Sequence, residues 1–217
     1  MKYLLFLIFI LAACEQPLGI EDNVRKTIMS GDLIPLRVNN EWIYQINEYD
    51  ENLHIINGPF HQTIKISDTR HFNEETWYKF FDNTNHLEQY LRSEDDGLWM
   101  RMPDIFPGEQ IRFVKLPARI NESDTITNFE LPRDDTKLLV QTLISTDLIV
   151  EVNGNEYQVI KIKFDHIDSD NNKYIGPYLE QFYATGLGLI KENYYSVDQN
   201  GQFFISKIRE MVEATIQ

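Results

Sequence analysis

The sequence predicts an all-β, mainly antiparallel domain of about ten strands in a meander that forms a barrel or strongly curved sheet, with little helix. Apolar residues recur with a period of two: Trp42, Tyr44 and Ile46 fall on one face of an extended chain, and Gln45 and Asn47 fall on the other. Hairpin chemistry separates such runs, because four dipeptides tolerate positive φ: Asn57-Gly58, Asp96-Gly97, Asn153-Gly154 and Asn200-Gly201. These dipeptides predict sequential antiparallel pairing.

The same alternation recurs along the chain after Pro35. It is found in residues 63–67, 98–102, 111–113, 148–152 and 160–164. Residues 117–135 contain Pro117 and Pro132 and are expected to form a long polar loop. Helical spacing occurs only before Gly31 and, weakly, in the tail at 207–214. We therefore expect one β-rich domain over residues 34–217.

The first residues are typical of a secretory leader. Lys2 supplies a positive start, a short apolar stretch follows, and the small residues Ala12 and Ala13 precede the only cysteine, Cys14. The apolar stretch is too short to span a bilayer as a helix. Residues 1–13 are thus expected to be a signal peptide, the alternative being a buried amino-terminal helix with a chance cysteine.

The segment Leu11-Ala12-Ala13-Cys14 resembles the lipobox of bacterial lipoproteins, in which the cysteine is acylated and becomes the first mature residue. The resemblance implies that Cys14 carries the acyl chains, that a membrane is a partner, and that residues 14–33 form a lipidated tether. Glu15 follows the cysteine where an inner-membrane retention signal would have aspartate. We therefore expect a location in the bacterial cell envelope, at the outer membrane.

Composition limits the kinds of partner and the source of stability. The chain carries 20 basic and 34 acidic side chains, a formal net charge of -14, so its surface repels nucleic acid. With Cys14 committed to lipid, no disulfide can form. Stability must come from the core, for which 13 Phe, 11 Tyr and 3 Trp supply ample apolar material.

Two stretches resemble a group of uncharacterised β-rich bacterial lipoproteins. Residues 35–44, Pro-Leu-Arg-Val-Asn-Asn-Glu-Trp-Ile-Tyr, are similar to that group's opening, and residues 182–191, Phe-Tyr-Ala-Thr-Gly-Leu-Gly-Leu-Ile-Lys, to its closing segment. Residues 151–157 resemble its central hairpin. The opening departs at Asn39, where glycine is usual, although asparagine also accepts a left-handed conformation. The resemblance implies a compact β domain on a lipid tether and no known activity.

Signatures of catalytic, cofactor and metal sites are missing. The five histidines fall in separate segments without zinc-helix spacing. Residues 165–172 are acidic, but Lys173 and Leu179 occupy positions where a calcium loop needs glycine and glutamate, so we expect a polar connection between strands. No Gly-x-Ser-x-Gly elbow is present, and Gly186-Leu187-Gly188 is interpreted as a bend between strands. We therefore predict no catalytic residue, no cofactor and no metal.

Aromatic residues are the remaining candidates for a binding site. A barrel or curved sheet commonly holds an apolar ligand in its mouth, although core packing explains the same residues without a ligand. The candidate lining residues are Trp42, Tyr44, Trp77, Phe80, Trp99 and Phe182.

Three functional hypotheses follow. The leading one is a non-enzymatic binding or assembly module that holds an apolar small molecule or docks an envelope protein. The first alternative is a secreted hydrolase of glycans or lipids, with a pair of carboxylates in an open cleft. The second is a purely structural envelope protein, which predicts a filled core. A hollow interior would favour the carriage of a ligand.

Overall fold

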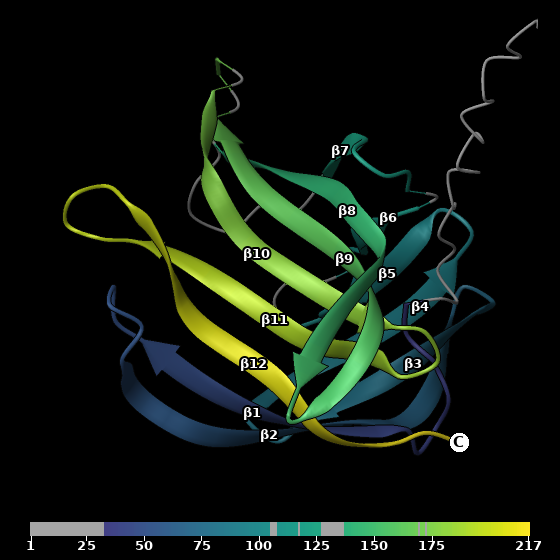
Figure 1. Cartoon of the computed structure of the whole chain (residues 1–217). Coiled ribbons are helices and arrows are strands. Elements are labelled where there is room, and N and C mark those ends of the chain that lie inside the picture. The colour runs from purple at the N-terminus through teal and green to yellow at the C-terminus, as the bar shows by residue number, and fades with distance from the viewer. Residues whose placement is uncertain (1–32, 105–107, 117, 127–136, 169, 172) are drawn as a thin grey trace, which may run out of the picture.

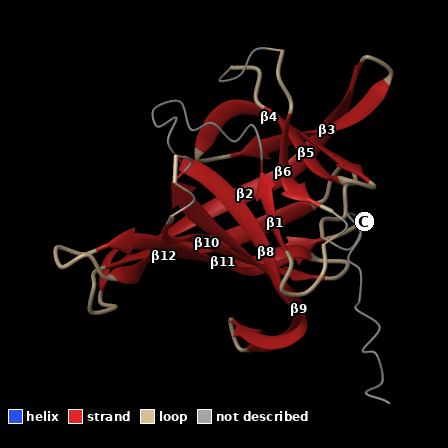
Figure 2. Ribbon diagram, turned by 90° about the horizontal axis from the view of Figure 1, so that it is seen from above, coloured by secondary structure: helices blue, strands red, loops and turns tan. Residues whose placement is uncertain are grey.

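The computed structural model describes residues 33–104, 108–116, 118–126, 137–168, 170–171 and 173–217. The described residues form strands, turns and loops without a helix, so the all-β prediction is confirmed (Figure 2). This part of the chain forms twelve strands where about ten were expected. They are β1 Glu41–Tyr49, β2 Ile55–Phe72, β3 Glu75–Asp82, β4 Asn85–Glu94, β5 Gly97–Arg101, β6 Ile111–Lys115, β7 Ser123–Ile126, β8 Lys137–Val152, β9 Asn155–Asp168, β10 Tyr174–Ala184, β11 Gly188–Val197 and β12 Phe203–Thr215.

The strands form a single antiparallel sheet that curves into a nearly closed barrel (Figure 1). Its order is β6-β5-β4-β3-β2-β1-β12-β11-β10-β9-β8-β7, so the first and last strands pair with each other. In that pair, Trp42 lies opposite Ala214 and Gln45 opposite Glu210. The expected meander is therefore confirmed, and the break in the ladder lies in the middle of the chain, between β6 and β7.

Side chains bridge this break. The amide of Gln141 on β8 accepts a hydrogen bond from the backbone N–H of Lys115 on β6 and donates one to its carbonyl oxygen, both at 2.9 Å. The ammonium of Lys115 also forms an ion pair with Asp124 on β7. Gln141 thus supplies both hydrogen-bonding groups that a neighbouring strand would otherwise offer.

Two clusters of buried residues make up the core. The first includes Leu33, Leu98 and Leu143, and the second includes Trp42 and Met211. Because Leu33 is fully buried in the first cluster, the packed domain includes the last residue of the expected tether. The leader at 1–13 and the rest of the tether lie outside the described residues.

The long β8–β9 hairpin folds over the sheet. Its register shifts between Leu143 and Ser145 and again before Leu148, and its far half crosses in front of β11 and β12 (Figure 1). At the tip, Asn153 has a φ of 50° and its side-chain amide donates to the carbonyl oxygen of Met211, 2.6 Å away. This hydrogen bond fixes the tip to β12.

Three of the four predicted hairpin dipeptides connect consecutive strands, and Asn57-Gly58 does not. Asn57 and Gly58 lie inside β2, at a register shift against β1, where Gly58 has a φ of 107°. The turn comes earlier because the Asp50 carboxylate accepts the backbone N–H groups of Asn52 at 2.9 Å and His54 at 2.8 Å. The predicted turn was wrong because an Asx turn closes the hairpin instead.

Two further expectations are corrected. The segment expected to be a loop at 117–135 contains β7, and part of it lies outside the described residues. The weak helical spacing at 207–214 belongs to β12, where pairing with β1 and β11 satisfies the backbone on both sides. In the part of the chain that is described, no helix could cross a membrane.

Candidate functional site

The inner face of the barrel lines a partly open cavity of about 350 Å³. Ligand pockets commonly measure about 300–1,000 Å³, with mostly apolar walls and a few polar groups. Alternate residues of each strand point inward, so nearly every strand contributes to the wall. The aromatic part of the wall consists of Trp42, Tyr44, Phe80, Phe113, Phe164, Tyr178, Tyr183 and Tyr194.

Trp42 and Tyr44 are held in place by carbonyl groups on a distant part of the chain. The indole N–H of Trp42 donates to the carbonyl oxygen of Leu187 at 2.5 Å, and the hydroxyl of Tyr44 donates to that of Leu189 at 2.8 Å. The Trp42 ring also stacks on Phe80, with centroids 6.3 Å apart. The segments 35–44 and 182–191, which are far apart in the sequence, thus meet at the cavity wall.

A buried ion pair crosses the floor of the cavity between β11 and β12. Arg209 Nη2 lies 2.5 Å from Glu192 Oε2, and Glu192 is only 2% exposed. The same carboxylate accepts hydrogen bonds from the Gln181 amide at 2.7 Å and the Tyr194 hydroxyl at 2.8 Å. Burial alone would lower the pKa of Arg209, but Glu192 and the nearby tyrosines raise it above its usual range. Arg209 is therefore a permanent cation.

The polar network continues from Arg209 on β12 to β2 and β3. Arg209 Nη1 donates to Gln62 Oε1 at 3.0 Å, and Gln62 Nε2 donates to Asp82 Oδ2 at 2.8 Å. Asp82 Oδ1 in turn accepts the Thr84 hydroxyl at 2.7 Å. The described charged residues of the lining are Asp82, Glu192 and Arg209, so the lining is net negative.

One buried polar atom of a lining residue has no partner: the Nε of Arg209. Tyr178 also lines the cavity, and its ring packs against His166 with the ring centroids 4.6 Å apart. Burial and the charge of Glu192 raise the pKa of Tyr178, so its hydroxyl keeps its proton.

Three of the six aromatic candidates line the cavity: Trp42, Tyr44 and Phe80. The other three lie elsewhere. Trp77 is fully buried under the Arg92 guanidinium, 4.8 Å from its ring. Trp99 packs against Arg112 and donates to Asp96 at 2.8 Å.

Phe182 faces away from the cavity for reasons of strand parity. It lies between Gln181 and Tyr183, which both point inward, and Lys161 covers its ring at 5.2 Å. The sequence marks neither Glu192 nor Arg209 as a lining residue, and for Glu192 the reason is that β11 is polar on both faces. Lys191 and Asn193 alternate there with Glu192 and Tyr194, so no period of two marks the inward side.

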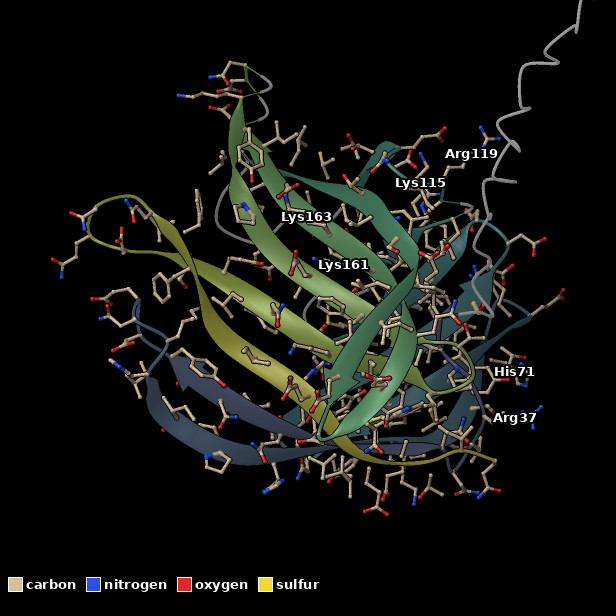
Figure 3. All side chains as sticks on the ribbon, viewed as in Figure 1. Arg37, His71, Lys115, Arg119, Lys161 and Lys163 are labelled. Atoms are coloured by element: carbon tan, nitrogen blue, oxygen red, sulfur yellow. The ribbon has the colours of Figure 1, made fainter. Side chains whose placement is uncertain are left out.

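Basic side chains outside the cavity face carboxylates. Figure 3 labels Lys161 and Lys163 on β9, Lys115 on β6, and Arg119. Their partners are, in order, Glu180 at 2.6 Å, Asp165 at 3.0 Å, Asp124, and Glu122 at 3.6 Å. These four cations therefore do not form an open site for an anion.

In the acidic segment 165–172, the Asp168 carboxylate is hydrogen-bonded to residues of the same turn. Asp168 accepts the backbone N–H of Asp170 at 2.9 Å and the side-chain amide of Asn171 at 3.0 Å. Across the described residues, no three His, Cys, Asp or Glu side chains are grouped so that they could hold a metal ion.

Comparison with known proteins finds no family model and no curated protein that matches the chain. Two solved structures align with most of it at low similarity. One comes from Bacteroides fragilis and is provisionally described as an exported protein with a YmcC-like fold. It is 10% identical to this chain with a TM-score of 0.47, and the alignment covers 85% of this chain and 99% of the other. The second, provisionally described as a lipoprotein, comes from Parabacteroides distasonis, with 11% identity, a TM-score of 0.45 and coverage of 88% and 100%.

Proposed function

We propose that the chain is a lipid-anchored protein of the bacterial cell envelope whose β domain holds a small apolar ligand inside the barrel without changing it chemically. The cavity of about 350 Å³, with its aromatic wall, carries this proposal. Such a volume admits a small molecule and excludes a protein segment of any length. The cavity therefore favours a ligand over a docked protein partner.

The hollow interior also weighs against a purely structural role. Close packing stabilises a core, and an unfilled space forfeits contacts between its walls. A protein selected only for stability gains nothing from leaving large side chains such as Trp42 and Phe80 on the edge of an empty space. A ligand that fills the space restores those contacts.

The arrangement of the acids favours binding over hydrolysis. Two carboxylates line the cavity, as the hydrolase alternative requires. Glu192, however, already receives Arg209, Gln181 and Tyr194, and Asp82 receives Gln62 and Thr84. A general acid or base must be free to exchange a proton with a substrate, and these contacts already engage both carboxylates.

The anchoring part of the proposal rests on the leader and on Cys14. Residues 14–32 would reach roughly 60 Å if fully extended, which would let the domain stand clear of the bilayer. Acyl chains on Cys14 would fix the protein to the outer membrane. Intact-mass analysis of the purified protein tests this part, since the proposal requires an acylated Cys14 at the amino terminus and an unmodified thiol on a longer chain contradicts it.

Native mass spectrometry of the full chain, extracted gently from its own membrane, tests the ligand. We expect a retained small molecule, and we expect Leu91→Trp to abolish it, because Leu91 lines the cavity and a larger side chain would occupy the space. Leu148→Trp is the matched control: Leu148 is 38% exposed and lies outside the cavity, so the ligand should remain. Wild-type protein that carries no small molecule, or a ligand retained equally by both variants, contradicts the proposal.

A further inference from the structure

We infer that the ligand carries one positive charge on an otherwise apolar body, and that its charged group lies beside Asp82 and the stacked rings of Trp42 and Phe80. This inference rests on the proposed function and adds the chemical class of the ligand, an amphiphilic organic cation. It follows from an unbalanced carboxylate in the lining and from the aromatic faces next to it.

The lining holds one carboxylate more than it holds cations. Arg209 is its only cation, and Nη2 of Arg209 pairs with Glu192 at 2.5 Å. Asp82 receives only uncharged donors, namely the Gln62 amide at 2.8 Å and the backbone N–H and hydroxyl of Thr84 at 2.9 and 2.7 Å. In the part of the chain that the structure describes, no basic side chain forms an ion pair with Asp82. A positive group on the ligand would balance this charge.

Asp82 can accept a cation at a modest cost. A carboxylate offers about four lone-pair sites, and the three donors leave one of them open, on the oxygen that receives only the Gln62 amide. Asp82 is the last residue of β3 and is half-buried, so a cation beside it keeps part of its hydration shell. The desolvation cost is therefore smaller there than it would be beside the buried Glu192.

The aromatic side chains next to Asp82 can also hold a cation. In the strand register, Asp82 lies opposite Ile64 and Ile64 lies opposite Trp42, so the three form one row across the inner face. Phe80 precedes Asp82 by two residues on the same face and stacks against Trp42, with the ring centroids 6.3 Å apart. Because the face of an aromatic ring attracts positive charge, these rings and the carboxylate favour the same kind of group.

The same wall already holds one cation in this way. The guanidinium carbon of Arg209 lies 4.8 Å from the centroid of the Tyr44 ring, and Glu192 supplies its negative partner. A cationic group beside Asp82 would reproduce this arrangement, with the stacked rings in place of Tyr44.

Other ligand charges fit the lining less well. An anionic group would meet a carboxylate that has no cation beside it, and this repulsion is larger in a cavity than in water. An uncharged ligand would leave the negative charge unbalanced. The rest of the lining is mostly aliphatic and aromatic, as at Leu91, Met100 and Phe113, so the body of the ligand must be apolar.

The experiment is a competition against bromooctane. Bromine quenches tryptophan fluorescence on contact, and of the three tryptophans only Trp42 lines the cavity. The full chain in an uncharged detergent is saturated with bromooctane, and Trp42→Phe supplies the background from Trp77, Trp99 and the micelle. Octyltrimethylammonium, octanol and octanoate then compete at neutral pH. We expect the cation to restore fluorescence at a concentration at least about tenfold lower than the alcohol, and octanoate to be the weakest.

Two variants separate this inference from the proposed function. Asp82→Asn keeps the size of the side chain and should weaken the cation about tenfold, while quenching by bromooctane stays unchanged and shows that the cavity is intact. Asp95→Asn is the matched control, because it removes the same charge from an exposed turn outside the cavity and should leave all three competitors unchanged.

The outcomes distinguish the two proposals. A cation that competes no better than octanol, or that is weakened equally by Asp82→Asn and Asp95→Asn, overturns the inference and leaves cavity binding intact. Absence of Trp42 quenching by bromooctane overturns both.

Discussion

The side chain of Gln141 hydrogen-bonds to both backbone groups of Lys115 across the break in the barrel, with both distances at 2.9 Å. Gln141 is only 1% exposed, so water does not compete for these bonds. At all the remaining junctions of the sheet, neighbouring strands are joined by backbone hydrogen bonds. At this break, a side-chain amide takes that role. The Gln141 amide therefore joins β6 to β8, beside the ion pair of Lys115 with Asp124 on β7.

Replacing this glutamine tests the closure directly. We expect Gln141→Leu to lower the free energy of unfolding by about 1–3 kcal/mol, because it leaves the Lys115 N–H and carbonyl oxygen without partners in a buried place. Urea denaturation of the full chain measures the change. Gln158→Leu is the control, since Gln158 is exposed on β9 and should shift stability by no more than about 0.5 kcal/mol. Equal effects of the two variants would contradict the role of Gln141.

The buried pair of Glu192 and Arg209 predicts a strongly asymmetric mutant series. Arg209→Met should cost about 3–5 kcal/mol, because it leaves the Glu192 carboxylate buried without its cation. The double variant with Glu192→Gln should be more stable than Arg209→Met alone, since the uncompensated charge is gone. Both are measured by urea denaturation.

The neighbouring pair of Lys191 and Glu210 provides the matched control. It joins the same two strands at 2.6 Å, but its side chains are 19% and 26% exposed. Lys191→Met should therefore cost only about 0–1 kcal/mol. A loss as large as that of Arg209→Met would mean that strand pairing, and not burial of charge, sets the cost.

The tyrosines around the ion pair predict a loss of stability at high pH. Burial raises the pKa of Tyr44, Tyr183 and Tyr194 above the ordinary value of 10.0. The folded state therefore favours the neutral phenol. This contribution is fully present below about pH 10 and is lost as the pH rises above it, because the unfolded chain then releases protons that the folded chain retains.

Urea midpoints measured from about pH 8 to about pH 11 test this prediction. We expect the midpoint to fall with increasing pH and to fall less steeply for Tyr194→Phe, which removes one of the three hydroxyls. The variant should also be less stable at neutral pH, since it lacks the donor to Glu192. Identical slopes for the two proteins would show that Tyr194 ionises as easily when folded as when unfolded.

Local patterns predicted the strands and most of the turns. The alternation at Trp42 and Tyr44 places both on a buried face, and the dipeptide Asn153-Gly154 forms its hairpin. The prediction failed where a side chain competed with a dipeptide, as when Asp50 closed the first hairpin ahead of Asn57 and Gly58. It also failed in β12, where pairing with two neighbours outweighs weak helical spacing.

The cavity was only half predictable. Trp42, Tyr44 and Phe80 could be predicted as large aromatic residues in alternating strands. Phe182 does not line the cavity, because its neighbours Gln181 and Tyr183 face inward and Phe182 therefore faces outward. Glu192 and Arg209 could not be predicted as lining residues, because a charged residue in a strand is expected to face solvent unless its partner is known. Their partnership requires β11 and β12 to be in one particular register.

The sequence alone determined the all-β class, the two faces of most strands and the chemistry of three hairpins, since each depends on residues close together in the chain. Tertiary structure decided that β1 pairs with β12, that Gln141 closes the break at Lys115, and that the interior retains a cavity. These features depend on register between distant strands and on how side-chain volumes add up across a closed sheet. No local period encodes either quantity.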